Sequence, residues 1–527
     1  MGQRLSTLFL AWFLFIGASE QQALNIISSN GGLNTRAGAL TVENNQATDL
    51  QNVHFTTTGS ILKRRGNNKF GDTLGAADEV TLLADYRLVS GTSKIVAASG
   101  AVVYKTDGTG DGVWDDITSG ETVTADSTFD FDQFRDLLLF TNGTDLPFKW
   151  DATGSPSDIA QMGVPTNLTK AKHIAVWNDY TFLCNVTVSS TDHPSRCYYT
   201  NAGTADTFTA TDFIHLGRDK GEGEISLVEP LGDRLVIGKQ YGAIYNVFFT
   251  GDSDLPFISQ KSFSQVGSGA DYANVVVNNV LFFWSTDGLG FYAYDGQNSI
   301  KISENITPTL EDYASSRFAN IIGKTYPKLN QIWWLMTSTG STHDTIVVFD
   351  YQNKAWTIYK GIAASYITTV QNGGVLDLYT GNYAGVLAKQ DISNTDINSA
   401  GTDGQDIVSF FYTKWFDMGA PYMKKSIDHL IVYNTIEGEW NVDVAVGYDF
   451  ADSDSVTLAL SLSGGGVLWG AQNWGAFNWS TTGGGATSRM DFKGRGRVCR
   501  FHFSNNNADE PFEIVGYSII YKNETIF

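Results

Sequence analysis

One stretch of the chain partly matches a calcium-binding loop. Asp107, Thr109 and Asp111 alternate in KTDGTGDG, and a glycine follows at the sixth position. Hard cations need several oxygen ligands on a tight turn, which this spacing could supply. The twelfth position is Thr118 rather than a bidentate Glu, so the loop is incomplete. We name Asp107, Thr109 and Asp111 as candidate metal ligands, against the alternative of a solvated turn between strands, and expect no other cofactor.

The sequence lacks the signatures of common enzyme classes. Carboxylate pairs can hydrolyse glycosides, and 56 Asp and Glu leave such pairs open. However, the Ser-x-Asp-x-Gly-x-x-Trp box of sialidases does not occur, and the seven His residues are widely separated. Neither a Gly-x-Ser-x-Gly elbow nor a phosphate-binding loop is present. We therefore predict a protein that is not an enzyme.

Two basic clusters could contact DNA phosphates or an acidic neighbouring subunit. For the first cluster we favour a charged strand edge that blocks unwanted pairing. The second cluster alternates along a strand, so its side chains could share one face, and both interpretations stay open. The seven residues are Lys63, Arg64, Arg65, Lys493, Arg495, Arg497 and Arg500.

The chain as a whole is strongly acidic. It has 35 Lys and Arg against 56 Asp and Glu, a formal net charge of −21. Nucleic-acid binders need the opposite balance, so this composition argues against tight binding of nucleic acid. It is compatible with a soluble surface, or with a wall along which DNA slides without sticking.

Cysteines and the N-terminus bear on the compartment. Cys184 and Cys197 flank a predicted hairpin and could form a disulfide in an oxidising compartment, but with three cysteines we favour unpaired thiols. Residues 1–19 combine Arg4, a short apolar run and small residues, which is typical of a secretory signal. The alternatives are an over-long gene start and a short assembly leader. No segment is long and apolar enough to predict a membrane span.

A repeat of polar corners followed by apolar strands predicts the architecture. Its mean spacing of about 47 residues matches the blades of β-propellers, and 54 Gly with 13% aromatic residues favour short strands and tight turns. We predict an all-β protein with a roughly seven-bladed β-propeller at 76–391, whose large aromatic residues fill the layers between blades. The corners are Ser90-Gly91, Arg135-Asp136, Asn178-Asp179, Gly232-Asp233, Asn278-Asn279, Leu329-Asn330 and Asn372-Gly373.

The flanking regions complete the predicted organisation. Residues 20–75 form a polar N-terminal arm, and the turn-forming residues of 392–406 form a linker. Renewed alternation over 407–527 predicts a C-terminal β-sandwich of jelly-roll type. Within it, a Gly-rich loop carries three exposed-looking tryptophans, Trp469, Trp474 and Trp479.

Three stretches resemble the β-propeller tail proteins of short-tailed bacteriophages, called tail tubular protein B, tail nozzle or head–tail hub. They are the arm NGGLNTRAGALTVENNQATDLQNVHFTTTGSILKRRG, the segment from HIAVWNDYTFLCNVTV to RCYYTNAGTADTF, and the end FKGRGRVCRFHFSNNNADEPFEIVGYSIIY. The resemblance implies a virion tail subunit in a homo-oligomeric ring, with adaptor or portal proteins and tail fibres as partners. DNA would pass transiently through an acidic channel.

The competing hypothesis is a secreted β-propeller that binds or hydrolyses carbohydrate. The signal-like start and the three tryptophans favour it, whereas the repeat, the predicted sandwich and the resemblance favour the virion. We take the virion tail as the expected location and secretion as the alternative.

Overall fold

Short strands joined by tight turns make up nearly all of the protein. The computed structural model describes residues 20–91, 93–106, 112–152, 158–217, 221–463 and 485–524. Within these ranges the all-β prediction is confirmed, and no helix is long and apolar enough to span a lipid bilayer. The helical segments are α1 (Thr307–Glu311) and three 3-10 turns, η1 (Glu304–Ile306), η2 (Ser315–Asn320) and η3 (Pro327–Leu329).

Seven antiparallel four-stranded sheets follow one another along the described chain. The first three are β7 (Val80–Arg87), β8 (Ser93–Ser99), β9 (Val102–Thr106), β10 (Trp114–Asp116); β11 (Asp130–Phe134), β12 (Leu137–Thr141), β13 (Phe148–Trp150), β14 (Ala160–Gln161); and β15 (Leu168–Trp177), β16 (Tyr180–Val188), β17 (Thr191–Thr200), β18 (Phe208–His215). The next three are β19 (Ile225–Leu231), β20 (Arg234–Lys239), β21 (Ile244–Phe249), β22 (Phe257–Lys261); β23 (Val275–Val277), β24 (Val280–Ser285), β25 (Gly290–Tyr294), β26 (Ser299–Lys301); and β27 (Ile322–Tyr326), β28 (Gln331–Met336), β29 (Thr345–Asp350), β30 (Ala355–Lys360). The seventh combines β31 (Tyr366–Asn372), β32 (Val375–Gly381) and β33 (Leu387–Ser393) with β6 (Gly66–Lys69).

Each predicted corner lies just before the second strand of one of these sheets. The backbone takes positive φ at every corner, for example at Asn178 (53°) and Asp179 (62°). Two consecutive residues at positive φ match the right-handed twist of a hairpin, and Asn, Asp and Gly tolerate that conformation best. The corner chemistry of the sequence is therefore confirmed.

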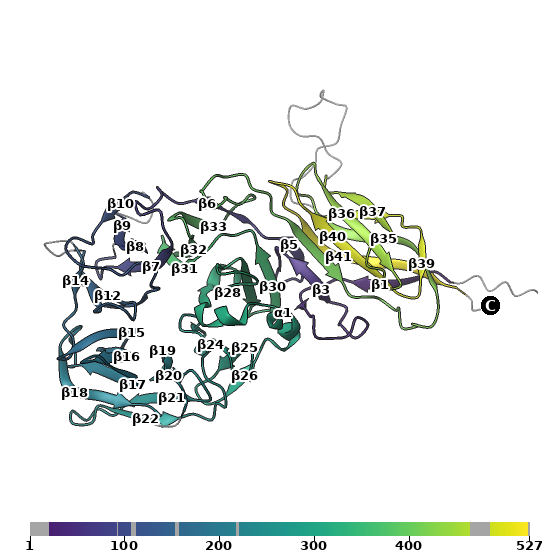
Figure 1. Cartoon of the computed structure of the whole chain (residues 1–527). Helices are drawn as coiled ribbons and strands as arrows, with labels where there is room; N and C mark the ends of the chain where they lie inside the picture. Colours follow the sequence, from purple (N-terminus) through teal and green to yellow (C-terminus); the bar gives the residue numbers. More distant parts are fainter. Residues whose placement is uncertain are drawn as a thin grey trace, which may run out of the picture.

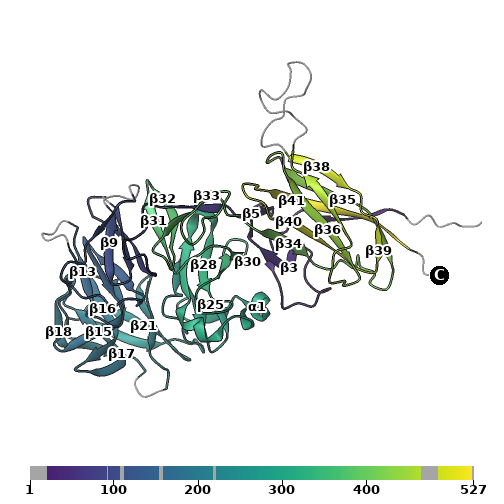
Figure 2. The same cartoon turned by 45° about the horizontal axis from the view of Figure 1, so that its top comes forward.

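The sheets are arranged around a common centre (Figures 1 and 2). The first strand of one sheet contacts the first strand of the next, as β7 does with β11, β11 with β15 and β27 with β31. β31 of the seventh sheet also contacts β7 of the first sheet. The arrangement is propeller-like, since each sheet buries its faces against its neighbours.

The outermost strand of the seventh sheet comes from the other end of the chain. β6 pairs antiparallel with β33, with Lys69 opposite Ala388 and Asn67 opposite Gln390. The N-terminal arm therefore does not stand apart from the sheets, because one of its strands completes the seventh. A strand contributed from far away in sequence links the beginning and the end of the ring.

Two larger sheets lie beside the propeller-like part, at the end of the molecule where β39 lies (Figures 1 and 2). The seven-stranded sheet contains β1 (Gln22–Ile26), β4 (Val53–Phe55), β5 (Ile61–Lys63), β35 (Lys425–Thr435), β38 (Gly485–Met490), β39 (Gly494–Gly496) and β41 (Glu513–Asn523). The six-stranded sheet contains β2 (Gly32–Leu33), β3 (Gln46–Gln51), β34 (Ser409–Thr413), β36 (Asn441–Tyr448), β37 (Val456–Ser461) and β40 (Cys499–Asn505). Three strands of the N-terminal arm, β1, β3 and β5, thus pair with C-terminal strands.

One apolar core joins the two parts of the molecule. It runs from Trp334 and Trp356 of the sixth four-stranded sheet to Phe411 and Phe503 of the six-stranded sheet, all buried. The rings of Trp334 and Trp356 stack with Phe291 between neighbouring sheets, at 4.1 and 5.4 Å between centroids. Aromatic packing therefore fills the layer between the fifth and sixth sheets, as the sequence predicted.

Candidate functional site

A cavity of about 420 Å³ lies where the first strands of the four-stranded sheets meet. We call it the axial cavity. Strands β11, β15, β19, β27 and β31 contribute to its lining, as does the segment before β23. Its charged side chains are Asp130, Asp132, His173, Glu229, Asp271 and Lys324.

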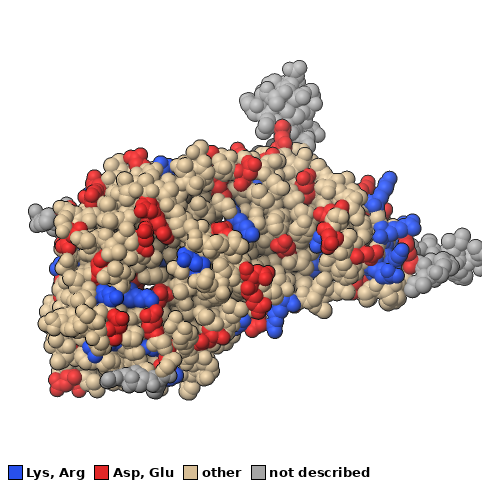
Figure 3. Space-filling model, viewed as in Figure 1, with Lys and Arg blue, Asp and Glu red and all other residues tan. Residues whose placement is uncertain are grey.

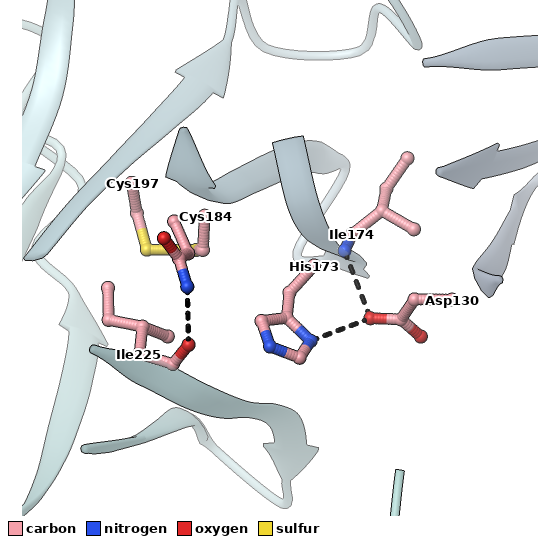
Figure 4. Close-up of a disulfide and its surroundings, with 7 residues drawn as sticks. Asp130, His173, Ile174, Cys184, Cys197 and Ile225 are labelled. Atoms are coloured by element: carbon pink, nitrogen blue, oxygen red, sulfur yellow. Dashed lines mark hydrogen bonds and ion pairs between the residues drawn. A yellow bond between two sulfur atoms is a disulfide. The ribbon is translucent and has the colours of Figure 1, made fainter. Parts of the chain in front are cut away.

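A buried histidine joins two of these carboxylates. His173 Nδ1 lies 3.1 Å from Asp130 Oδ2, which also accepts the backbone N–H of Ile174 (Figure 4). His173 Nε2 faces Asp271 Oδ1 at 3.6 Å. Burial lowers the pKa of His173, but the hydrogen bonds and charges of Asp130 and Asp271 raise it by more, so that the pKa is about 9. The imidazole is therefore charged at neutral pH.

Asp271 is held in its ionised form. Lys172 Nζ lies 2.9 Å from Asp271 Oδ2 and 3.0 Å from Glu224 Oε1. Burial raises the pKa of Asp271, but His173 and Lys172 outweigh burial and leave the pKa below its ordinary value. This side of the cavity therefore carries balanced, paired charges.

Glu229 and Asp132, unlike Asp271, have pKa values above those of ordinary carboxyl groups. Burial, followed by the nearby charge of Asp130, raises the pKa of Glu229 to about 8. Burial also raises the pKa of Asp132 to about 6, although backbone N–H groups of Val176 and Gln133 donate to its carboxylate. Two carboxyl groups in one cavity with different affinities for protons are an arrangement often found in binding and catalytic sites.

Lys324 is the one lysine that lines this cavity within the described ranges. Its ammonium lies over the ring of Phe131, 5.6 Å from the centroid. Within the same ranges, neither Lys324 nor Glu229 forms a hydrogen bond or an ion pair with another side chain. The cavity therefore contains one carboxyl group and one ammonium whose polar atoms are free to contact a bound molecule.

Sequence reasoning did not single out these residues. A signal was present, because acidic residues interrupt apolar first strands in FDFDQF and SLVEPL. A buried strand position is a costly place for a carboxylate. The sequence alone could not say that Asp130 and Glu229, 99 residues apart in number, line the same cavity.

The second predicted basic cluster lies at one end of the molecule, where Lys and Arg side chains gather around β39 (Figure 3). Lys493, Arg495 and Arg497 are exposed there. Arg495 is opposite Ser426, which is in turn opposite Lys522 on the other side, so these residues project from one face of the sheet. Lys493 and Arg495 line one shallow groove with Asp428 and Asp491, and Arg495 Nε lies 2.9 Å from Glu524 Oε1. We call the exposed residues Lys493, Arg495 and Arg497 the basic end.

Arg500 does not belong to the basic end. It lies in β40 of the six-stranded sheet, and its guanidinium stacks over Tyr412 (4.8 Å) and Trp415 (4.7 Å). The prediction that all four residues share one face is therefore wrong for Arg500. The cluster spans two sheets because the strand that begins at Cys499 pairs with β36 and β34.

The first basic cluster is placed differently from the predicted surface contact. Lys63 is buried and donates to Asn505 Oδ1 (2.7 Å), and burial lowers its pKa to about 8. Arg64 is buried against Asp396. Arg65 alone is exposed. Lys63 and Arg64 are therefore internal pairing residues. Neither the favoured interpretation, a charged strand edge, nor contact with DNA or another subunit holds for them, because both side chains are buried and β5 pairs with β4 and β41.

Cys184 and Cys197 form a disulfide between adjacent strands (Figure 4). They are direct cross-strand partners in β16 and β17, and both are fully buried. The preference for unpaired thiols was therefore wrong for these two. Cys499 is buried and free, and burial raises the pKa of its thiol to about 12.

Several predicted features lie outside the described residues. These include the calcium-loop residues Asp107, Thr109 and Asp111, the leader 1–19, and the tryptophans at 469, 474 and 479. In the described part of the chain, no group of three or more His, Cys, Asp or Glu is placed to hold a metal ion.

The solved structures that resemble this chain do so weakly. No family model and no curated protein matches the chain. A computationally designed protein, Ika8, is 13% identical over 68% of this chain and 99% of its own, with a TM-score of 0.38. BamB from Moraxella catarrhalis is 13% identical over 65% and 96%, with a TM-score of 0.36. BBS1N, solved in complex with ARL6DN, is 11% identical over 62% and 98%, with a TM-score of 0.39. Similarity at this level carries no argument about function.

Proposed function

We propose that this protein is a non-enzymatic structural subunit of a bacteriophage tail or head–tail hub. In this proposal the seven four-stranded sheets are the blades of a seven-bladed propeller, and the two larger sheets form a jelly-roll-like sandwich. Copies of the subunit assemble into a ring that forms part of the channel for genome retention and ejection. Adaptor or portal proteins and tail fibres are its neighbours in the virion.

The observation that carries the proposal is the separation of charge. The chain has a net charge of −21, yet its exposed Lys493, Arg495 and Arg497 gather at one end. Complementary potentials steer association and fix its register more than they add affinity. A basic end on an otherwise acidic subunit therefore supports contact with the acidic surface of a second copy.

The channel in this proposal runs between subunits. The axial cavity of about 420 Å³ is far too small for a DNA duplex, whose major groove alone is about 12 Å wide. An acidic wall shared by several subunits would repel phosphates and let the duplex slide.

The test is the oligomeric state of the purified full-length protein, measured by light scattering and by electron microscopy at low and high ionic strength. We expect rings that weaken as salt screens the charges. The variant K493E/R495E should assemble less, whereas the matched control R36E/R135E, which reverses two exposed arginines elsewhere, should assemble normally. A monomer at high concentration, or equal assembly of both variants, would refute the proposal.

A secreted propeller that binds or hydrolyses carbohydrate is the second candidate. The disulfide between Cys184 and Cys197 favours it, because disulfides persist in oxidising compartments. The mass of the mature N-terminus separates the two candidates. Cleavage near Ser19 favours secretion, and an intact start in purified virions favours the tail.

A further inference from the structure

The axial cavity contains two polar groups whose partners are missing. Glu229, which is largely protonated at neutral pH because its pKa is raised to about 8, and Lys324 line the same cavity without forming an ion pair with each other or with another described residue. Both side chains are half-buried, and a partly buried polar group without a partner is costly, so such groups normally contact ordered water or a ligand. Asp130 keeps about a quarter of its side chain exposed, at 26%, so the cavity is open to solvent.

The unmet groups are of two kinds. Lys324 supplies a donor and Glu229 supplies a carboxyl group, whereas His173 Nε2 already faces the ionised Asp271 Oδ1 at 3.6 Å. A molecule that contacts both Lys324 and Glu229 must accept a hydrogen bond from the ammonium and form a hydrogen bond with the carboxyl group.

Aromatic rings supply the apolar part of the lining. Phe131, Tyr272 and Tyr366 all face the cavity. The two tyrosine hydroxyls donate to backbone carbonyls of Thr128 (2.9 Å) and Phe129 (3.0 Å), which fixes the orientation of their rings. Ligand sites combine apolar and aromatic walls with a few placed polar groups in the same way.

Other ligand classes fit this lining less well. A phosphate or carboxylate would meet the acidic side chains of Asp130, Asp132 and Asp271. A small cation would leave Lys324 unmet and would be repelled by it and by the charged imidazole of His173. A metal ion lacks a set of three suitable ligands in the described part of the chain.

We infer that the axial cavity binds a neutral polyhydroxylated molecule, one or two sugar rings in size. Hydroxyl groups both donate and accept, so they can contact the carboxyl of Glu229 and the ammonium of Lys324 together. The C–H face of a sugar ring packs against Phe131, Tyr272 or Tyr366. The volume of about 420 Å³ is within the range of small-molecule sites and exceeds what a few ordered waters fill. This site is separate from the basic end, so it does not depend on assembly.

The test uses the full-length protein and a panel of neutral monosaccharides and disaccharides based on glucose, galactose, mannose and N-acetylglucosamine. Saturation-transfer NMR identifies a bound sugar, and calorimetry gives its affinity. We expect Glu229→Leu and Lys324→Met each to weaken binding by about tenfold or more, because each removes a group that hydrogen-bonds to the sugar.

Matched controls are Glu311→Leu and Lys301→Met, which change side chains that do not line the axial cavity. They should bind as the unchanged protein does. Circular dichroism checks that all four variants fold. If one cavity variant does not fold, the other still tests the inference. Absence of transfer from every sugar, equal binding by the cavity variants, or preferential binding of putrescine, calcium or inorganic phosphate would each overturn the inference. None of these outcomes alters the ring test of the proposed assembly.

Discussion

The buried ion pair between Arg64 and Asp396 offers the sharpest test of how the molecule is held together. Both side chains are 2% exposed. The guanidinium donates to Asp396 Oδ1 (2.9 Å) and Oδ2, to Asn52 Oδ1 (2.8 Å) and to the carbonyl of Lys360 (3.0 Å). One side chain thereby connects the N-terminal arm, the end of β30 and the segment after β33.

The expected magnitude follows from what Arg64→Met leaves behind. The carboxylate of Asp396 stays buried without its cation, and removing one partner of a buried pair costs about 3–5 kcal/mol. A loss of about 4 kcal/mol corresponds to about a thousandfold change in an opening equilibrium. Replacing both residues in R64M/D396L removes the stranded charge, so this double variant should recover most of that loss.

Hydrogen exchange followed by mass spectrometry measures the opening equilibrium of each segment. We expect the peptides that contain β6 and Asp396 to lose about a thousandfold protection in Arg64→Met. Arg65→Met is the matched control, because Arg65 is the exposed neighbour of Arg64 and its replacement should lower the free energy of unfolding by less than about 0.5 kcal/mol. Equal effects of the two single variants, or a double variant as unstable as Arg64→Met, would refute the reasoning.

Three further changes have expected outcomes. The pKa of His173 is raised to about 9, so its protonation contributes about 3 kcal/mol to the free energy of unfolding. That contribution is complete below about pH 6.5 and is lost as the pH rises through 9. The free energy of unfolding of His173→Gln, measured in urea, should lack that decline. In denaturant without reductant, iodoacetamide should add one adduct per chain, at Cys499. The variant C184A/C197A should lower the free energy of unfolding by about 3 kcal/mol, because the disulfide closes a loop with a sequence separation of 13. Asn67→Pro removes the N–H that donates to the carbonyl of Thr395, so exchange in β33 should rise; unchanged exchange would contradict the closing role of β6.

The corners were predictable because their chemistry is local. A residue such as Asn178 or Gly232 adopts positive φ for reasons contained in two or three neighbours. That is why the seven hairpins, and through their spacing the propeller-like arrangement, could be predicted from the sequence. The aromatic layers followed, because large rings in alternating strands must be covered.

Features that depend on distant partners could not be predicted. Three consecutive basic residues suggested a surface position, but Arg64 is buried against the carboxylate of Asp396. Nothing in the sequence around Arg64 or Asp396 indicates that the two residues pair. β6 pairs with β33, and β1 pairs with β41, across more than three hundred residues each. The axial cavity also depends on distant partners, since its charged residues come from four different first strands and from the segment before β23.

These long-range pairings bear on how the two proposed activities relate. The N-terminal arm contributes β6 to the seventh four-stranded sheet, β3 to the six-stranded sheet and β5 to the seven-stranded sheet. The same arm carries Arg64 and Lys63, whose buried contacts reach the segment after β33 and the end of β40. With the apolar core that runs from Trp356 to Phe503, these contacts hold the two parts as one body. The basic end and the axial cavity share no lining residue, so assembly and ligand binding can be tested as independent properties of the same protein.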